Sequence, residues 1–215
     1  MDEITNSAVL KGTLAARPVF SHSVRQEEFW RFPLEVERLS GTADRINILA
    51  RRELLEELCI GEGEKLLVTG QVRSFNNRSG QGSRLVITVF AQNIAFADGA
   101  DANSVRLIGC LCRKPVLRRT PLGREISDML LAVQRRYGRF DYLPCIAWGR
   151  QAEEAAGWQA HSRVLLTGRI QSRNYIKMLD SASEERTAYE ISAVSLRQIT
   201  EPAGRSPESL LCPEA

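Results

Sequence analysis

The chain contains the same sequence pattern twice. Residues 6–14 (NSAVLKGTL) are matched by residues 103–111 (NSVRLIGCL), an offset of 97 positions (103 − 6). Both copies continue to a basic residue followed by Pro-Val, and a later Thr-Gly pair recurs at an offset of 98 (Gly70 and Gly168). A period of this length far exceeds the about 20–50 residues of a solenoid unit. The repeat therefore predicts two homologous domains fused in one chain.

The length of 215 residues fits this interpretation, because two domains of roughly 100 residues can each bury a core. We predict a first domain over residues 1–97, a linker over 98–102 and a second domain over 103–200. Residues 201–215 contain Pro, Gly and Ser at breaker positions, so we predict a disordered tail there.

Both copies have the pattern of β-structure. Segments such as 9–14 and 84–94 mix apolar and polar residues with many β-branched positions. Each copy has one short helix-like stretch after its third expected strand, at 52–58 and 150–158. Strands interrupted by one helix at this place are typical of the OB-fold, a five-stranded Greek-key barrel. We therefore predict an all-β protein of two tandem OB-fold barrels, each with one short helix.

Cysteine usage and hydropathy limit the class of protein. The five cysteines are odd in number and do not repeat between the copies, which argues against a disulfide framework. Cys110 and Cys112 stand two apart, but no second pair of ligands accompanies them, so we predict free thiols and no metal site. No apolar run approaches the ~18 residues needed to cross a bilayer, and the first residues do not resemble a signal peptide. We expect a cytoplasmic protein without a cofactor.

Charge is distributed unevenly between the copies. Residues 1–102 carry 12 Lys and Arg against 14 Asp and Glu, whereas residues 103–200 carry 16 against 9. The second copy is thus basic by seven charges while the first is slightly acidic. A basic domain suits a polyanion partner, although a merely solvated surface can carry the same charge.

The sequence shows no catalytic motif. Asp44 and Asp141 recur at the repeat offset, but a carboxylate at the entry to a strand is more often a turn residue than a general base. We therefore expect a binding protein and not an enzyme.

Aromatic and basic residues interleave in the second copy. The segment 135–142 is RRYGRFDY, the next strand ends at Trp148, and the segment 168–175 is GRIQSRNY. Single-stranded nucleic acid suits this pairing, because rings stack on bases and guanidinium groups neutralise phosphates. Tyr142 and Trp148 are six residues apart, so they share one face of a regular strand. On the later strand, even spacings likewise place three residues on one face: Arg169, Arg173 and Tyr175.

The alternative for each ring is a place in the hydrophobic core. It is strongest for Trp148, because large aromatic side chains are usually well buried. It is weaker for the three tyrosines, which stand beside arginines near strand ends.

The stretch from Asn103 to Leu196 resembles the bacterial single-stranded DNA-binding protein family. Some replication-restart proteins share its fold and pattern. The matching motifs follow one another through almost the whole second domain: NSVxLIG at 103–109, Pro115, RTPxG at 119–123, LAVxR at 131–135, WGRxAE at 148–153, GRIxSRxY at 168–175 and YEI at 189–191.

The resemblance implies that aromatic side chains on the second barrel stack on bases. The positions that match the family's rings are Tyr137, Tyr142, Trp148 and Tyr175. We predict phosphate contacts at six arginines: Arg119, Arg135, Arg139, Arg150, Arg169 and Arg173. Family members usually assemble four barrels, so two barrels per chain predict a homodimer. Replication and repair proteins are possible further partners, although the family's acidic tail has no full counterpart in residues 206–215.

The first copy departs from the family pattern. Its residues at the four aligned ring positions are not aromatic: Ser40, Arg45, Arg51 and Asn77. Trp30 shares strand parity with Phe32 and Leu34, which predicts a core position, whereas Phe29 falls on the opposite face. We predict that the first barrel scaffolds, assembles or adds auxiliary DNA contacts through Phe29, Arg45, Arg51 and Arg73.

The predicted function is non-sequence-specific binding and protection of single-stranded DNA in replication, recombination or repair. The alternative is a protein–protein adaptor of a replication-restart or recombination complex with little affinity for DNA. RNA binding is a third hypothesis, because ring stacking does not distinguish the sugar.

Overall fold

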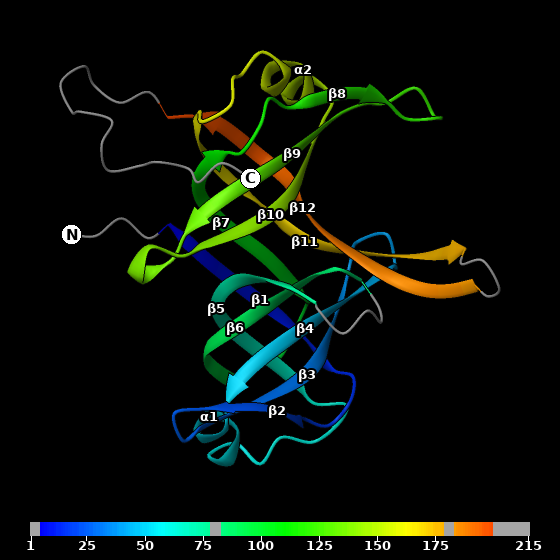
Figure 1. Cartoon of the computed structure of the whole chain (residues 1–215). Helices are drawn as coiled ribbons and strands as arrows, with labels where there is room; N and C mark the ends of the chain where they lie inside the picture. The colour runs from blue at the N-terminus through cyan, green and yellow to red at the C-terminus, as the bar shows by residue number, and fades with distance from the viewer. Residues whose placement is uncertain (1–4, 78–82, 179–182, 200–215) are drawn as a thin grey trace. The chain divides into compact units, whose positions relative to one another are not determined.

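The computed structural model describes residues 5–77, 83–178 and 183–199 (Figure 1). These residues form twelve strands and a few short helical turns, so the protein is all-β as predicted. The predicted tail lies outside the described residues. Within the described residues, no helix is both long enough and apolar enough to span a membrane.

The first copy folds into a closed Greek-key barrel. Its strands pair in the order β2-β3-β4-β6-β5-β1, and an additional pairing of β1 with β3 closes the barrel. The helix α1 directly follows β4, the third strand of the closed barrel, as the sequence predicted. The OB-fold prediction is therefore confirmed. The elements are β1 (Asn6–Leu14), β2 (Val19–Val24), β3 (Glu27–Glu37), β4 (Ala43–Arg51), α1 (Arg52–Glu56), β5 (Lys65–Asn76) and β6 (Leu85–Phe96).

The second copy repeats this topology. Its strands pair in the order β7-β11-β12-β10-β9-β8, and β7 also pairs with β9. Each barrel thus has a short sixth strand, β2 or β8, beyond the predicted five. The elements are β7 (Ala102–Leu111), β8 (Val116–Arg119), β9 (Glu125–Gln134), the 3₁₀ turn η1 (Arg136–Gly138), β10 (Phe140–Trp148), α2 (Arg150–Ala156), β11 (Arg163–Met178) and β12 (Ser183–Gln198).

The repeated glycines mark places where neighbouring strands approach closely. A Cβ on Gly12 would collide with the backbone oxygen of Glu35, and one on Gly109 with that of Ala132. Gly70 and Gly168 meet the facing strand in the same way. These contacts explain why the sequence repeats at glycine positions, since any side chain there would push the barrel strands apart.

Each barrel buries the inward face of its strands. In β10, Leu143, Cys145 and Ala147 are buried on the inward face. Of the alternate residues, Tyr142 is half-buried and Trp148 is exposed, whereas Ile146 between them is buried as well. Cys110 and Cys145 are buried free thiols, and Cys59 is an exposed free thiol. No cluster of three or more metal-ligating side chains occurs in the described part of the chain.

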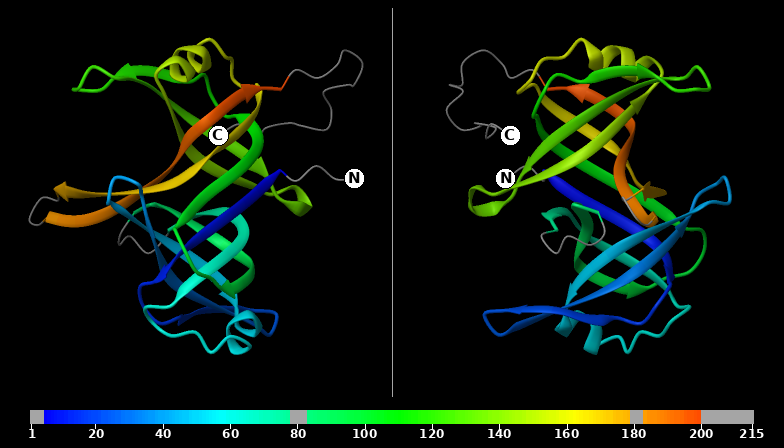
Figure 2. Two further views of the ribbon diagram at one scale, coloured as in Figure 1. Left: turned by 180° about the vertical axis from the view of Figure 1, so that it is seen from behind. Right: turned by 45° about the vertical axis from the view of Figure 1, so that its right-hand side comes forward.

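The chain divides into two compact units that do not follow the sequence copies throughout. One unit comprises residues 7–105 together with 170–189, and the other comprises residues 5–6, 106–169 and 190–199. The described residues of the exchanged segment, 170–178 and 183–189, belong to β11 and β12, which run side by side as a long ribbon (Figures 1 and 2). We call residues 170–178 and 183–189 the arm. The domain boundaries predicted from the sequence remain a prediction.

Candidate nucleic-acid interface

A buried ion pair fixes the turn that leads into β10. Arg135 Nε donates to Asp141 Oδ2 at 2.7 Å, and a second guanidinium nitrogen pairs with Oδ1. Asp141 is fully buried, so it stabilises the turn and is not a loose surface carboxylate. Arg135 was predicted to contact phosphate, but its guanidinium is already engaged by this carboxylate.

β10 carries two of the predicted stacking residues on its outer face. Its pairing with β9 runs without interruption from Phe140 to Trp148, so the even spacing of Tyr142 and Trp148 places them on one side. That side is opposite to the buried Leu143, Cys145 and Ala147. Tyr142 and Trp148 thus share one face of β10, as their even spacing in the sequence predicts.

Trp148 stands partly in solvent. It retains 39% of its exposure, and its indole Nε1 donates to Ser192 Oγ on β12 at 3.2 Å. This bond holds one edge of the indole and leaves the ring surface partly accessible. Tyr142 is half-buried, and it packs with Cys112 and Phe140 over a small apolar cluster of Cys110 and Ala132. Tyr142 is thus held by packing and Trp148 by a hydrogen bond at its edge, which favours a fixed stacking platform.

The predicted phosphate contacts in this unit are mostly at the surface. Arg139, Arg150 and Arg169 are exposed. Arg119 is exposed as well, but its Nη2 donates to Glu125 Oε1 at 3.0 Å. An exposed pair of this kind is weak and screened, so a phosphate can replace the carboxylate.

Two carboxyl groups lie among the predicted phosphate contacts: Glu125 pairs with Arg119, and Glu153 hydrogen-bonds with Glu125. The pKa of Glu125 is lowered mainly by its hydrogen bond with Arg119, and next by its hydrogen bond with Glu153. The pKa of Glu153, on α2, is raised because its carboxyl shares a hydrogen bond with Glu125. The sequence did not indicate this acidic pair, because the two residues are 28 positions apart (153 − 125).

Tyr175 and Arg173 lie in the arm and therefore belong to the compact unit of the first barrel. Tyr175 retains 38% of its exposure and Arg173 is exposed. The four predicted stacking positions thus divide between the two units, with Tyr142 and Trp148 in one and Tyr175 in the other. The backbone of Tyr137 lies in η1, but its side chain is outside the described residues.

A second buried ion pair attaches the arm to β4. Arg38 Nε donates to Asp44 Oδ2 at 2.7 Å, which repeats the Arg135–Asp141 pair at the repeat offset. Asp44 also accepts from the backbone N of Ser172 at 2.7 Å and from its hydroxyl at 3.2 Å. The two repeated aspartates therefore act in the structure as buried ion-pair partners.

Tyr189 provides a further anchor for the arm. Its hydroxyl donates to the backbone O of Arg45 at 3.0 Å and accepts from Asn47 Nδ2 at 3.2 Å. Burial raises the pKa of this phenol. Neutral Tyr189 thus keeps both hydrogen bonds at physiological pH.

The auxiliary residues of the first barrel lie on its outer face. The side chains of Arg45 and Arg51 are exposed, and they pair with Glu35 at 3.6 Å and Glu27 at 3.3 Å. Arg73 donates to the side chain of Gln71. Phe29 stacks on His22, with ring centroids 5.0 Å apart. His22 is thus a residue of this surface that sequence analysis missed, because its partner lies on another strand.

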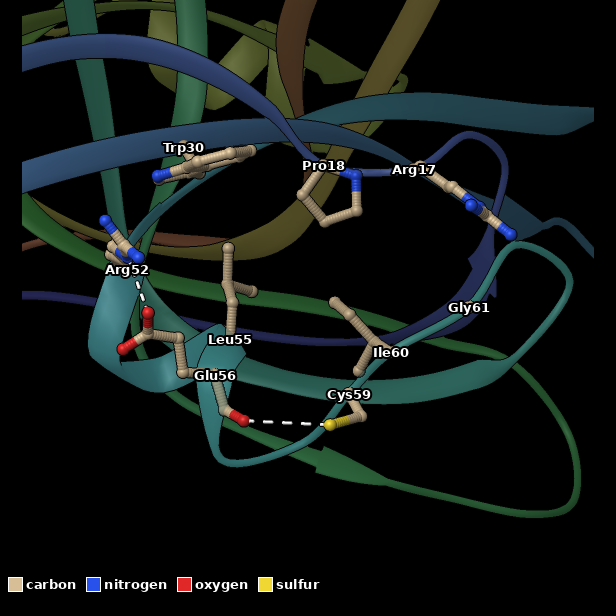
Figure 3. Close-up of a pocket in the computed structure, with 9 residues that line it drawn as sticks. All are labelled: Arg17, Pro18, Trp30, Arg52, Leu55, Glu56, Cys59, Ile60 and Gly61. Carbon is tan, nitrogen blue, oxygen red and sulfur yellow. Dashed lines mark hydrogen bonds and ion pairs between the residues drawn. The ribbon is translucent and has the colours of Figure 1, made fainter.

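The surface of the first barrel has an open pocket of about 470 Å³ beside α1 (Figure 3). Pro18, Trp30, Leu55 and Ile60 form its apolar lining, and Arg52 at its edge pairs with Glu56. Trp30, predicted to be a core residue, is half-buried and lines this pocket.

Comparison with known proteins identifies the second copy. Residues 102–199 match the model of the "Single-strand binding protein family". "Single-stranded DNA-binding protein 1" of Streptococcus agalactiae is 36% identical over 80 residues, which cover 34% of this chain and 49% of that protein. "Single-stranded DNA-binding protein A" of Bacillus subtilis is 38% identical over 80 residues, covering 34% of this chain and 46% of that protein. The chain thus spans about half the length of the curated relatives that it matches.

Solved structures match over both copies. The wild-type single-stranded DNA-binding protein from Thermus aquaticus superposes with a TM-score of 0.76 at 23% identity, covering 95% of this chain and 97% of that chain. A deletion mutant of the same protein gives a TM-score of 0.75. This likeness supports the tandem fold. The resemblance found in the sequence is confirmed: residues 102–199 form a domain of the Single-strand binding protein family.

Proposed function

We propose that the chain binds single-stranded DNA without sequence specificity, by stacking bases on exposed rings and neutralising phosphates with arginines. The observation that carries this proposal is the outer face of β10. There Tyr142 and Trp148 lie on one side of a regular strand, in a domain of the Single-strand binding protein family, and exposed arginines lie at both ends of the strand.

The remaining predicted contacts are distributed over both units. In the unit of β10, Arg119, Arg139, Arg150 and Arg169 supply positive charge, and Tyr137 is a further stacking position. Arg173 and Tyr175 belong to the other unit, where they add a charge and a ring. Arg135 acts in this proposal by fixing the turn before β10, because its guanidinium pairs with buried Asp141. Binding involves no chemical step.

The physiological role follows from the ligand. A protein of this kind protects exposed strands in replication, recombination or repair, in the cytoplasm. Two barrels per chain give four in a homodimer. Light scattering at micromolar concentration tests this: we expect twice the chain mass, and a monomer mass contradicts the homodimer.

Alanine variants on β10 test the binding surface. Trp148→Ala and Tyr142→Ala should each weaken binding to oligo-dT by about 1–3 kcal/mol, or about 5- to 150-fold. Circular dichroism should show an intact fold for Trp148→Ala, because its side chain lies partly in solvent. If oligo-dT leaves the intrinsic tryptophan fluorescence unchanged and binding is not detected, the adaptor hypothesis is favoured instead. Competition between matched DNA and RNA oligomers tests the preference for sugar.

A further inference from the structure

We infer that the first barrel has a base-stacking site of its own, built from a row of side chains that the family pattern does not contain. The row is His22, Phe29, Arg51 and Phe90. This inference rests on the proposed binding of single-stranded DNA and specifies where a second stretch of the same strand would bind.

The row crosses four neighbouring strands. His22 on β2 is the pairing partner of Phe29 on β3, and Phe29 is the partner of Arg51 at the end of β4. Phe90 lies on β6, the strand that pairs with β4. Each of the four strands therefore contributes one side chain, three of them rings and one a guanidinium.

The side chains of the row contact one another. The rings of His22 and Phe29 are stacked, with centroids 5.0 Å apart and planes 15° apart. The rings of Phe29 and Phe90 are 6.2 Å apart, and the Arg51 guanidinium carbon lies 5.9 Å from the centre of Phe90. Aromatic and cation–π contacts of this kind hold the rings in place. His22 is exposed, and Phe29 and Phe90 are half-buried, so part of each ring remains open to solvent.

The row lies on the outer face of the barrel. Phe32, Leu34 and Val36 of β3 are buried, and Phe29 has the opposite parity. Arg31 shares the parity of Phe29 and is exposed. The Arg51 guanidinium is about half exposed, and its pair with Glu27 is open to water, so a phosphate can compete for it.

The first barrel has a ring close to the position that Trp148 occupies in the second barrel, but on a different strand. Arg51 is the counterpart of Trp148 at the repeat offset of 97. Leu49 pairs with Phe90 in the first barrel, as Ile146 pairs with Ser192 in the second, so Phe90 is the counterpart of Ser192. In the second barrel a ring on β10 contacts a hydroxyl on β12, whereas in the first a guanidinium on β4 contacts a ring on β6.

The ring and its polar partner have therefore exchanged strands. At the position aligned with Trp148 the first barrel has Arg51 and no ring. The structure shows a ring retained at the same part of the barrel surface and extended by Phe29 and His22. Bases stack on aromatic rings with little dependence on sequence where positive charge holds the backbone beside them. The row combines adjacent rings with the Arg51 guanidinium, so it has the chemistry of a binding site for single-stranded nucleic acid.

Photo-crosslinking of the wild-type chain tests the site directly. A long dT oligomer carrying 5-iodouracil is irradiated on the full chain, and the attached peptides are sequenced by mass spectrometry. We expect adducts at His22, Phe29 or Phe90 in addition to adducts on β10. Adducts on β10 alone contradict the inference.

Substitutions provide a second measurement. The double variant Phe29→Leu/Phe90→Leu removes both rings and keeps the positions apolar. It should bind the long dT oligomer about fivefold more weakly and occlude fewer nucleotides per chain. Phe20→Leu is the matched control, because Phe20 is an exposed ring on the same β2 strand that contacts Trp30 instead of the row. It should bind as the wild type does.

The outcomes separate this inference from the proposed function. If wild-type chain does not bind dT at all, both fail. If Trp148→Ala weakens binding while the double variant keeps wild-type affinity and occluded length, only the stacking site of the first barrel is refuted.

Discussion

Replacing Asp44 by asparagine tests whether the buried ion pair holds the arm and the β3–β4 turn. Asp44 accepts two hydrogen bonds from Arg38 and two from Ser172, and it is fully buried. The amide introduced by Asp44→Asn keeps one acceptor oxygen but removes the negative charge that faces the Arg38 guanidinium, which is only 22% exposed. Removing one partner of a buried pair costs about 3–5 kcal/mol.

Because Arg38 keeps some contact with water, we expect the lower end of that range, a loss of about 3 kcal/mol in the free energy of unfolding. Urea denaturation followed by circular dichroism measures it. Ser172→Ala removes only the hydroxyl contacts and should cost about 1 kcal/mol.

Asp128→Asn is the matched control, because Asp128 pairs with Arg118 at an exposed position. That change should cost less than about 1 kcal/mol. If Asp44→Asn costs no more than Asp128→Asn, the buried pair does not stabilise the fold as described here.

Three further predictions concern other parts of the chain. The raised pKa of Glu153 means that its carboxyl becomes neutral at a higher pH than an ordinary glutamate. As the pH falls toward that pKa, one negative charge is lost, so oligo-dT binding at constant ionic strength should strengthen. This gain in affinity should vanish in Glu153→Gln. Burial raises the pKa of the Cys145 thiol, so a thiol reagent should modify exposed Cys59 in the native protein and reach Cys145 only after unfolding; rapid native labelling of Cys145 would count against its burial. Gly109→Ala should lower the thermal midpoint of unfolding, because its Cβ would meet the backbone of Ala132, whereas Gly123→Ala, where no atom lies within 4 Å, should show only the milder cost of its positive φ.

The architecture could be predicted from the sequence because each strand and helix pattern occurs twice, once in each copy. The offset of 97 aligned the two copies, and the helix position after the third barrel strand identified the OB-fold. On β10 the parity of Tyr142 and Trp148 was sufficient, since that strand pairs with β9 without a bulge. Local periodicity determines which face a side chain occupies when the strand is regular.

Features that depend on pairing between distant segments were not predictable in this way. The roles of Asp44 and Asp141 depend on arginines across a turn and, for Asp44, on Ser172 far along the chain. The assignment of Tyr175 to the compact unit of the first barrel depends on where the arm packs. The first barrel has a guanidinium on β4 and a ring on β6, the reverse of the arrangement in the second barrel. Alignment of the two copies does not predict this contact, because the distance in sequence between the two strands differs between the copies.

The most direct test of the account is a salt titration of oligo-dT binding by the wild-type chain and by Trp148→Ala. The account predicts that log K falls linearly with log salt, with a slope of about −0.7 per phosphate neutralised. It also predicts that Trp148→Ala weakens binding about fivefold or more at every salt concentration and leaves this slope unchanged, because the indole contributes stacking and no charge. Wild-type affinity in a folded Trp148→Ala, or binding independent of salt, would contradict the claim that β10 presents a stacking surface beside phosphate-binding arginines.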